Sequence, residues 1–515
     1  VFMNSKVKQS LRENAVVDDI AAGLAYSVVK NCLFKVLKIS NLDKLGDNIV
    51  VQGGTFRNDA VYRALELLSG KSVSSTDHPE LMGAFGAALY SRRQWETERK
   101  GSSFRGLEAV SAVETMRTTN MQCHGCTNQC SILKFVFDNG NTSYAGNKCE
   151  KIFHNSGRTE EKGYNAFDRK NEMLFNLPKD TPTRGKVGIP RVLNMYENYP
   201  FWHTLFTECG YEAVLSPESN FELYRTGVGS VMSDNICFPA KLVHGHFHSL
   251  IDSKVDRIFY PLVPKEEKEF GTSTNSWNCP VVSGYPDVIR SSIDPEGKYG
   301  LPFDRPIIGF NDDKVLRNGC REYFEGLGVP VNVFKRAFKK ALENRAAVVG
   351  EMRGFQQRLL EEAIAKAAPV FIIAGRPYHA DPLIHQKTGQ ILCDLGVTVL
   401  TDDVFREDDI TGFENLNVVS QWAYPNRVVQ SALKIAKMPR NVQLIQLNSF
   451  GCGPDSFYMD EASSILKAAG KNLTVIRIDE IASPGAVRLR LRSLVESLGH
   501  NAGAEGKKKG EYRGY

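Results

Sequence analysis

The chain has 515 residues, of which 42% are hydrophobic and 24% charged, and this balance excludes a disordered or fibrous protein. The formal net charge of +5 is small for the length and gives no reason to expect nucleic acid as a partner. No apolar run approaches the roughly 18 residues that a membrane span requires, and the amino terminus lacks a signal peptide's apolar stretch, so a cytoplasmic protein of about two to four domains is expected.

A long apolar helix is predicted over residues 18–39, and the strand NIVV follows it at 48–51. This strand leads into Gly53 and Gly54, and Asn58 is expected to cap the next helix. Two glycines after a strand allow the backbone to approach a nucleotide closely. An ordinary tight turn would use the same residues, so both interpretations remain open.

Four of the eleven cysteines surround a predicted hairpin, and in a reducing compartment such cysteines are more typical of metal ligands than of disulfides. The run between Cys130 and Cys149 is broken by Asn139-Gly140, which is typical of a two-residue type I′ turn and would place these two cysteines opposite each other. Cys123 and Cys126 are spaced as in a metal knuckle, so four thiolates could meet around one zinc ion or one iron–sulfur cluster. The spacing does not distinguish these metals, and four cysteines without a common ligand are the alternative.

From about residue 184 the sequence alternates predicted strands and helices. Strands are predicted first in KVGIPRVLNMY, YEAVLSP, RIFYPLV, NCPVVSGYP and RPIIGF. A helical segment at about 333–367 separates these from a second set of strands in PVFIIAG, VTVLTDDV, NVQLIQLNSF and LTVIRIDE. This alternation predicts two lobes, each with a doubly wound parallel sheet.

Three further cysteines lie where the ends of such sheets gather ligands. Cys237 precedes a helix in SDNICFPAK, Cys279 lies in NCPVV, and Cys452 directly follows a buried strand in LNSFGCGPDS. Helix amino termini would favour thiolates and an anionic cluster there, whereas buried apolar thiols are the alternative. The remaining cysteines fall within helical patterns and are expected in the core, namely Cys32, Cys209, Cys320 and Cys393.

Two other groups of polar residues are candidates for binding. His244 and His248 lie four apart on one helix face and could bind a metal, but a core role is the favoured alternative. The motif AGRPYHADP follows a strand and could bind an anionic ligand or donate a proton; a capping loop of the same residues is the alternative. Its polar residues are Arg376, Tyr378, His379 and Asp381.

The segments VFMNSKVKQSLRENAVVDDIAAGLAYSVV, VVQGGTFRNDAV and ELMGAFGAALYSRR resemble the carboxy-terminal part of the acyl-CoA dehydratase activases, which are actin-like and sugar-kinase-like ATPases. The resemblance covers about residues 1–95 and implies that Gly53, Gly54 and Asn58 border the adenosine of ATP. The family's phosphate loops and cluster-binding cysteines lie upstream of the residue where this sequence starts. We therefore expect the chain alone not to hydrolyse ATP and an upstream ATPase half or partner subunit to supply those loops.

Residues 184–500 resemble the catalytic subunits of 2-hydroxyacyl-CoA dehydratases and benzoyl-CoA-type reductases, and more closely the dehydratase-like half fused to large activases. The motifs CFPAK and FGCGPDS carry this resemblance. In those relatives three cysteines from two lobes hold a [4Fe-4S] cluster whose open iron receives the substrate, which implies this role for Cys237, Cys279 and Cys452.

The resemblance implies an oxygen-sensitive iron–sulfur redox protein that couples ATP-driven conformational change to low-potential electron transfer. It would work as an oligomer with electron donor and acceptor proteins on an acyl-CoA-type substrate. A non-catalytic zinc-binding scaffold is the alternative, and a sugar-kinase-like phosphotransferase is disfavoured by the missing phosphate loop. The predicted α/β chain has six parts: part of an activase-like ATPase domain (1–95), a four-cysteine β-ribbon (118–155), a first lobe (184–310), a helical connector (311–368), a second lobe (369–500) and a flexible tail (501–515).

Overall fold

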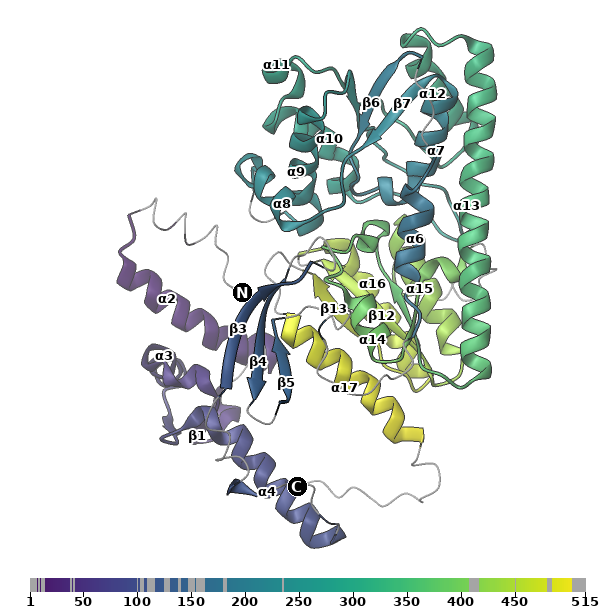
Figure 1. Cartoon of the computed structure of the whole chain (residues 1–515). Coiled ribbons are helices and arrows are strands. Elements are labelled where there is room, and N and C mark those ends of the chain that lie inside the picture. The colour runs from purple at the N-terminus through teal and green to yellow at the C-terminus, as the bar shows by residue number, and fades with distance from the viewer. Residues whose placement is uncertain are drawn as a thin grey trace. The chain divides into compact units, whose positions relative to one another are not determined.

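The computed structural model describes residues 14–37, 42–99, 116–124, 130–137, 140–146, 163–178, 183–233, 236–406, 416–449, 451–478 and 484–502, together with residues 7, 10, 39, 101, 106–108 and 153. The chain forms two compact units, Val1–Glu114 and Thr115–Tyr515, and each is described by itself (Figure 1). Within the described ranges, none of the helices combines the length and apolar composition that crossing a bilayer requires.

The first unit is a small α/β structure around two parallel strands. Its apolar centre consists of side chains from α2, α3 and the two strands, including Val29, Val61 and Leu65. In chain order its elements are α2 (Val17–Lys30), η1 (Asn31–Val36), η2 (Leu42–Leu45), β1 (Asn48–Val51), η3 (Gly54–Arg57), α3 (Asp59–Ser69), β2 (Ser72–Ser75), η4 (Pro79–Leu81) and α4 (Met82–Glu98).

The expectation that Cys32 lies in the core is wrong, because this thiol is exposed. The next residue, Leu33, is the one buried against α3 and the strands. Here the α-helix has given way to a π-helical segment, which changes the helical phase and therefore the residues that face the core.

A three-stranded antiparallel ribbon begins the second unit, with β4 (Ser131–Phe137) between β3 (Met116–Gln122) and β5 (Thr142–Ala145). The predicted two-residue turn is wrong: Val136 pairs with Thr142, which shifts the register by one residue. Gly140 adopts a left-handed φ of +78°, as expected for a three-residue hairpin loop. The predicted pairing of Cys130 with Cys149 lies outside the described residues, because the described ladder ends at Leu133 and Ala145.

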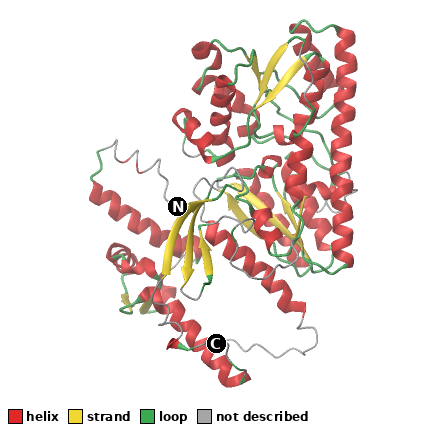
Figure 2. Ribbon diagram, in the orientation of Figure 1, coloured by secondary structure: helices red, strands yellow, loops and turns green. Residues whose placement is uncertain are grey.

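The first lobe contains a parallel sheet with strand order β7-β6-β8-β9. Figure 2 draws the strands in yellow and the helices around them in red. Its large core is rich in aromatic residues, of which Trp202 packs edge-to-face on Phe201, Phe259 and Phe310. The elements are α6 (Ala166–Phe175), β6 (Gly185–Ile189), α7 (Met195–Glu208), β7 (Tyr211–Leu215), α8 (Phe221–Gly227), η5 (Val228–Ser230), α9 (Phe238–Asp252), β8 (Arg257–Phe259), α10 (Pro280–Ser292), α11 (Pro295–Tyr299) and β9 (Phe303–Asp304).

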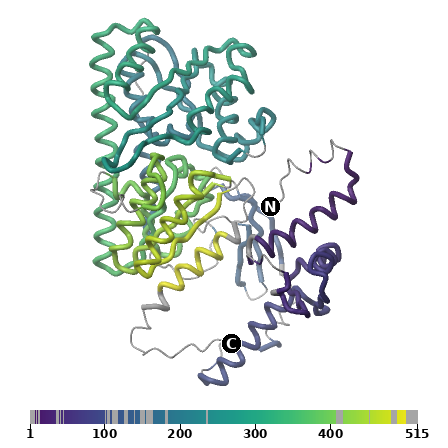
Figure 3. Tube along the Cα trace, turned by 180° about the vertical axis from the view of Figure 1, so that it is seen from behind, coloured from purple at the N-terminus to yellow at the C-terminus, as the bar shows by residue number. Residues whose placement is uncertain are grey.

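The second lobe repeats this architecture with strand order β11-β10-β12-β13, all parallel. Helices α12 (Asp313–Gly326) and α13 (Val331–Ala365) precede it, and α13 runs along both lobes (Figures 1 and 3). The elements of this lobe are β10 (Val370–Ala374), η6 (Pro377–Ala380), α14 (Thr388–Asp394), β11 (Thr398–Thr401), η7 (Asp402–Phe405), α15 (Ala423–Ala436), β12 (Val442–Ser449), α16 (Gly453–Ala468), β13 (Thr474–Ile478) and α17 (Pro484–Ala502). The α/β class with several parallel-sheet lobes is thus confirmed.

Two of the predicted strands are wrong. NCPVVSGYP forms the start of α10, in which Pro280 occupies a first-turn position that suits proline, and Val282, Tyr285 and Ile289 are buried at helical spacing. In RPIIGF, Ile307 makes an isolated bridge to Leu262. Burial on one helix face outweighs the β propensity of the valines in the first case.

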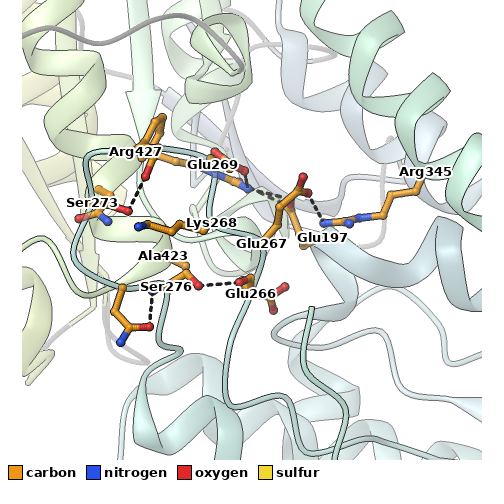
Figure 4. A pocket seen from close by; sticks show the side chains of 13 residues that line it. Glu197, Glu266, Glu267, Lys268, Glu269, Ser273, Ser276, Arg345, Ala423 and Arg427 are labelled. Carbon is orange, nitrogen blue, oxygen red and sulfur yellow. Dashed lines mark hydrogen bonds and ion pairs between the residues drawn. The ribbon is translucent and has the colours of Figure 1, made fainter. Parts of the chain in front are cut away.

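Buried ion pairs hold the two lobes together (Figure 4). Glu197 and Glu269 come from the first lobe, and Arg406 and Arg427 come from the second. Arg427 contacts both carboxylate oxygens of Glu197, at 2.7 and 3.1 Å, and Arg406 bridges Glu197 and Glu269 at 2.9 Å each. Each carboxylate therefore meets both guanidinium groups, which fixes the relative position of the lobes.

Candidate functional site at the starts of three helices

The three cysteines that the sequence singles out near the ends of the predicted sheets, Cys237, Cys279 and Cys452, all occupy the N-cap position of a helix. Cys237 precedes α9, Cys279 precedes α10 and Cys452 precedes α16. A proline lies one or two residues after each cysteine, where its missing N–H costs no helical hydrogen bond. Each thiol is therefore carried by the positive end of a helix, where free backbone amides stabilise negative charge.

These thiols, from both lobes, gather around the buried side chains of Arg376 and Tyr378. Arg376 Nη2 donates to Cys452 Sγ at 3.6 Å, and Cys279 also acts electrostatically on the guanidinium. Negative charge on any of the three thiols would raise the pKa of the Tyr378 hydroxyl, and negative charge on Cys279 would raise the pKa of Cys237. Cysteines that are 42 to 215 residues apart along the chain thus share one buried cation.

Burial raises the pKa of Cys237, which the amide of Ala240 and the charge of Arg376 partly offset. Burial likewise raises the pKa of Cys452 to about 12, against the opposing effects of Arg376 and the Asp455 amide. Both free thiols are therefore protonated at neutral pH, which makes them poor nucleophiles. Binding of a soft metal centre would supply the free energy to remove these protons.

The loop that follows β10 positions Arg376. Its backbone N–H donates to His379 Nδ1 at 3.0 Å, and the His379 ring lies 3.4 Å from Ser449 Oγ through Nε2. A Cβ at Gly375 would lie 2.3 Å from His379 Nδ1, so only glycine fits beneath this ring. Asp381 accepts from Leu383 N–H at 2.8 Å. The capping interpretation of AGRPYHADP thus describes His379 and Asp381, whereas the Arg376 side chain extends to the thiols.

The donor set fits an anionic, sulfur-ligated centre. Arg376 Nη2 also donates to Asp455 Oδ1 at 2.7 Å, and both side chains are about 3% exposed. Within the described ranges, Arg376 Nε and Asp455 Oδ2 are buried without a hydrogen-bond partner, which suits a site whose ligand completes the polar contacts. No three His, Cys, Asp or Glu side chains of those ranges are grouped to hold a single metal ion.

The ribbon brings together two of the four cysteines predicted as its ligands. Cys123 N–H donates to Cys130 O at 2.8 Å, which extends the β3–β4 ladder by one pair. Cys130 is buried and Cys123 is half-buried. Cys126 and Cys149 lie outside the described residues. The strand β3, which makes this pairing, is absent from the sequence prediction.

The glycine turn of the first unit has the expected backbone. Gly53 has a φ of +101°, which a side chain would strain, and its N–H donates to Pro79 O at 2.8 Å. Asn58 Oδ1 accepts from Ala60 N–H at 3.0 Å, which confirms the predicted helix cap. Gly54 begins a short 3-10 helix beside Glu80. The assignment of these residues to a nucleotide stays a prediction.

Two of the three histidines of α9, His244 and His246, are buried inside the fold. His244 lies between Ser230 at 2.8 Å and Tyr285 at 3.1 Å, and burial lowers its pKa to about 4. His246 contacts the hydroxyls of Ser216 and Ser219 instead. These contacts support the core role for His244, whereas His248 is only half-buried. The predicted core positions of Cys209, Cys320 and Cys393 are also confirmed, since all three are buried.

Comparisons with known proteins support a relationship to the activases and dehydratases. Residues 186–405 match the family described as CoA enzyme activase uncharacterised domain (DUF2229). The chain is 39% identical over 90 residues to the 2-hydroxyisocaproyl-CoA dehydratase activator of Clostridioides difficile, an alignment of 18% of this chain and 32% of that protein. The chain thus spans about a third of that relative's length.

Among solved structures, the chain was compared with a carbohydrate transporter from Acidothermus cellulolyticus 11B in complex with myo-inositol. The identity is 10%, and the alignment covers 57% of this chain and 73% of the transporter. The TM-score of 0.14 is too low for any conclusion about fold or ligand.

Proposed function

We propose that this chain is an iron–sulfur redox protein of the activase and dehydratase type, in which Cys237, Cys279 and Cys452 hold a [4Fe-4S] cluster between the two lobes. The observation that carries the proposal is the gathering of three helix-capping thiols around Arg376. Three N-cap cysteines, each on a different helix and all near one buried cation, support this proposal over the alternative of unrelated apolar thiols.

The residues would act in distinct ways on such a centre. The three cysteines would supply thiolates, and the helix amino termini with Arg376 would balance the negative charge of the ligated centre. A cluster bound there would supply one-electron chemistry and an iron open to a substrate atom.

ATP is assigned to Gly53, Gly54 and Asn58 in this proposal, with the phosphate loops supplied by an upstream ATPase half or a partner subunit. Transfer of an electron to a low-potential centre becomes favourable when two conformations bind ATP and ADP differently. The partners would be electron donor and acceptor proteins, and the substrate an acyl-CoA-type thioester. The match to a dehydratase activator and to a CoA enzyme activase domain supports these assignments.

Anaerobic reconstitution with iron and sulfide tests the proposal. Wild-type protein should turn brown and bind iron and acid-labile sulfide in equal amounts, whereas single serine variants of Cys237, Cys279 or Cys452 should lose most of this iron. Cys393→Ser is the matched control, because that thiol is buried and its hydroxyl replacement can still donate to Gly163 O. Equal iron in the control and the three variants would refute the assignment.

A zinc-binding scaffold is the second candidate, and the pairing of Cys123 with Cys130 favours metal binding by the ribbon. Zinc prefers four sulfur or nitrogen ligands, which Cys126 and Cys149 would complete. Zinc that disappears in Cys130→Ser, in a protein that takes up no iron, would support the scaffold. Iron in the wild type that survives in Cys130→Ser would instead place the redox centre at the helix ends.

A further inference from the structure

The buried ion pair of Arg376 and Asp455 touches the thiol site directly. Arg376 Nη2 is shared between Asp455 Oδ1 at 2.7 Å and Cys452 Sγ at 3.6 Å. The two charged residues come from neighbouring parallel strands: Arg376 follows β10, and Asp455 lies in the first turn of the helix after β12. The pair therefore belongs to the same strand ends as the site.

Both charges are almost fully removed from solvent, since the side chains are about 3% exposed. Water screens such charges poorly, so each acts strongly on a third charge nearby. Arg376 acts on Cys452 and Cys279 as well as on Asp455. The positive charge of Arg376 stabilises the thiolate form of Cys452, whereas the negative charge of Asp455 destabilises it. The pair thus places two opposite charges beside one ligand position.

We infer that Arg376 and Asp455 are positioning residues that set the reduction potential of the centre held by Cys237, Cys279 and Cys452. This inference rests on the proposed function. Addition of one electron from an electrode makes the centre one unit more negative and forms or breaks no bond. The positive charge of Arg376 stabilises the reduced centre, and the negative charge of Asp455 destabilises it. The reduction potential therefore depends on the balance between these two charges.

Two single variants should shift the potential in opposite directions. Arg376→Gln removes a positive charge and should lower the ratio of reduced to oxidised centre about tenfold or more at a fixed potential, which is about 59 mV for each tenfold. Asp455→Asn removes a negative charge and should raise that ratio by a similar factor. The double variant should return close to the wild-type potential, because the local net charge is restored.

Arg376→Lys is the matched control. It keeps the charge but not the planar hydrogen-bonding group, so it should remain near the wild-type potential if charge is the cause. A residue with only a structural role would change the iron content, or change all potentials in one direction. It would not produce shifts of opposite sign that cancel.

The experiment is an anaerobic redox titration followed by absorbance and electron paramagnetic resonance, with iron and sulfide measured on each sample. Opposite shifts that cancel in the double variant support the inference. Potentials that stay within a twofold change of the ratio in Arg376→Gln and Asp455→Asn, with full iron content, overturn it. If Arg376→Gln does not fold, Asp455→Asn alone decides, since an unchanged or lowered potential contradicts the inference. A wild-type protein that binds no iron refutes the proposed function instead.

Discussion

Replacing Arg427 with methionine should destabilise the larger unit, because the guanidinium of Arg427 compensates two buried carboxylates. It binds Glu197 at 2.7 and 3.1 Å and Glu269 at 3.0 Å, and its side chain is 5% exposed. Methionine keeps much of the apolar stem of Arg427 but removes its guanidinium group. Glu197 and Glu269 would then have to share the guanidinium group of Arg406. Removal of one partner from a buried pair costs about 3–5 kcal/mol.

The expected change in melting temperature follows from the size of the unit. Thr115–Tyr515 has about 400 residues, so its unfolding entropy near 60 °C is about 0.8 kcal/mol per kelvin. A loss of 3–5 kcal/mol therefore lowers the melting temperature by about 4–6 °C if the unit unfolds in one step. The same loss moves the midpoint of urea unfolding to a lower concentration.

Lys339→Met is the control, since Lys339 and Glu343 form an exposed pair on α13, with side chains 80% and 64% exposed. Exposed pairs contribute about 0–1 kcal/mol, so the melting temperature should move by about 1 °C or less. Calorimetry of both variants at equal salt measures the contrast. Equal small shifts in the two variants would refute the claim that the interlobe ion pairs hold the lobes together.

The effect should also depend on pH. Burial opposes ionisation of Glu197, but Arg406 and Arg427 outweigh it and hold the pKa of this carboxyl well below its usual value. A lowered pKa in the folded state contributes stability that is fully present above the unfolded pKa of about 4.3 and is lost as the pH falls below it. The difference between wild type and Arg427→Met should therefore be full at pH 7 and shrink below about pH 4.

Three other variants test separate parts of the account. Burial and the neighbouring Asp403 raise the pKa of Asp402 to about 6, so the folded state loses stability as the pH rises from about 4 to 6 and Asp402 ionises. Asp402→Asn should therefore raise the free energy of unfolding by about 1–3 kcal/mol at pH 8 and change it little at pH 4, as measured by urea unfolding. Gly375→Ala should cost about 1–3 kcal/mol in the same assay, because its Cβ would lie 2.3 Å from His379 Nδ1; a neutral result would mean that the loop can shift. Cys130→Ser should remove ribbon metal, measured by mass spectrometry, without changing iron bound elsewhere.

The sequence identifies the three helix-capping cysteines because each lies in a short motif beside a strand or helix signal. It does not identify Arg376 as their common neighbour, since that contact depends on how two lobes pack across a distance that no motif encodes. Asp455 is missed because its contact with Arg376 depends on the pairing of β10 with β12 within the second lobe, although its place in FGCGPDS is a local signal for the first turn of a helix.

Local ambiguity accounts for the other differences. The Asn139-Gly140 dipeptide occurs both in two-residue turns and in three-residue loops with glycine in the left-handed conformation, and the two alternatives differ by one residue of register. In NCPVVSGYP the adjacent valines favour a strand locally, but burial of Tyr285 and Ile289 on one face favours the helix. Tertiary packing decides such segments.

Differential alkylation tests the central claim most directly. The folded anaerobic protein, with and without prior loading with iron and sulfide, is treated with iodoacetamide at about pH 9 until Cys237, Cys279 and Cys452 of the unloaded protein are fully alkylated, because protonated thiols react slowly. The alkylation of each cysteine is then quantified by peptide mass spectrometry. If the thiols from the two lobes bind one centre, loading should protect Cys237, Cys279 and Cys452 together, and removal of the iron by a chelator should reverse the protection of all three in parallel. Loading that protects one of the three, or none, while iron binds to the protein would contradict the claim.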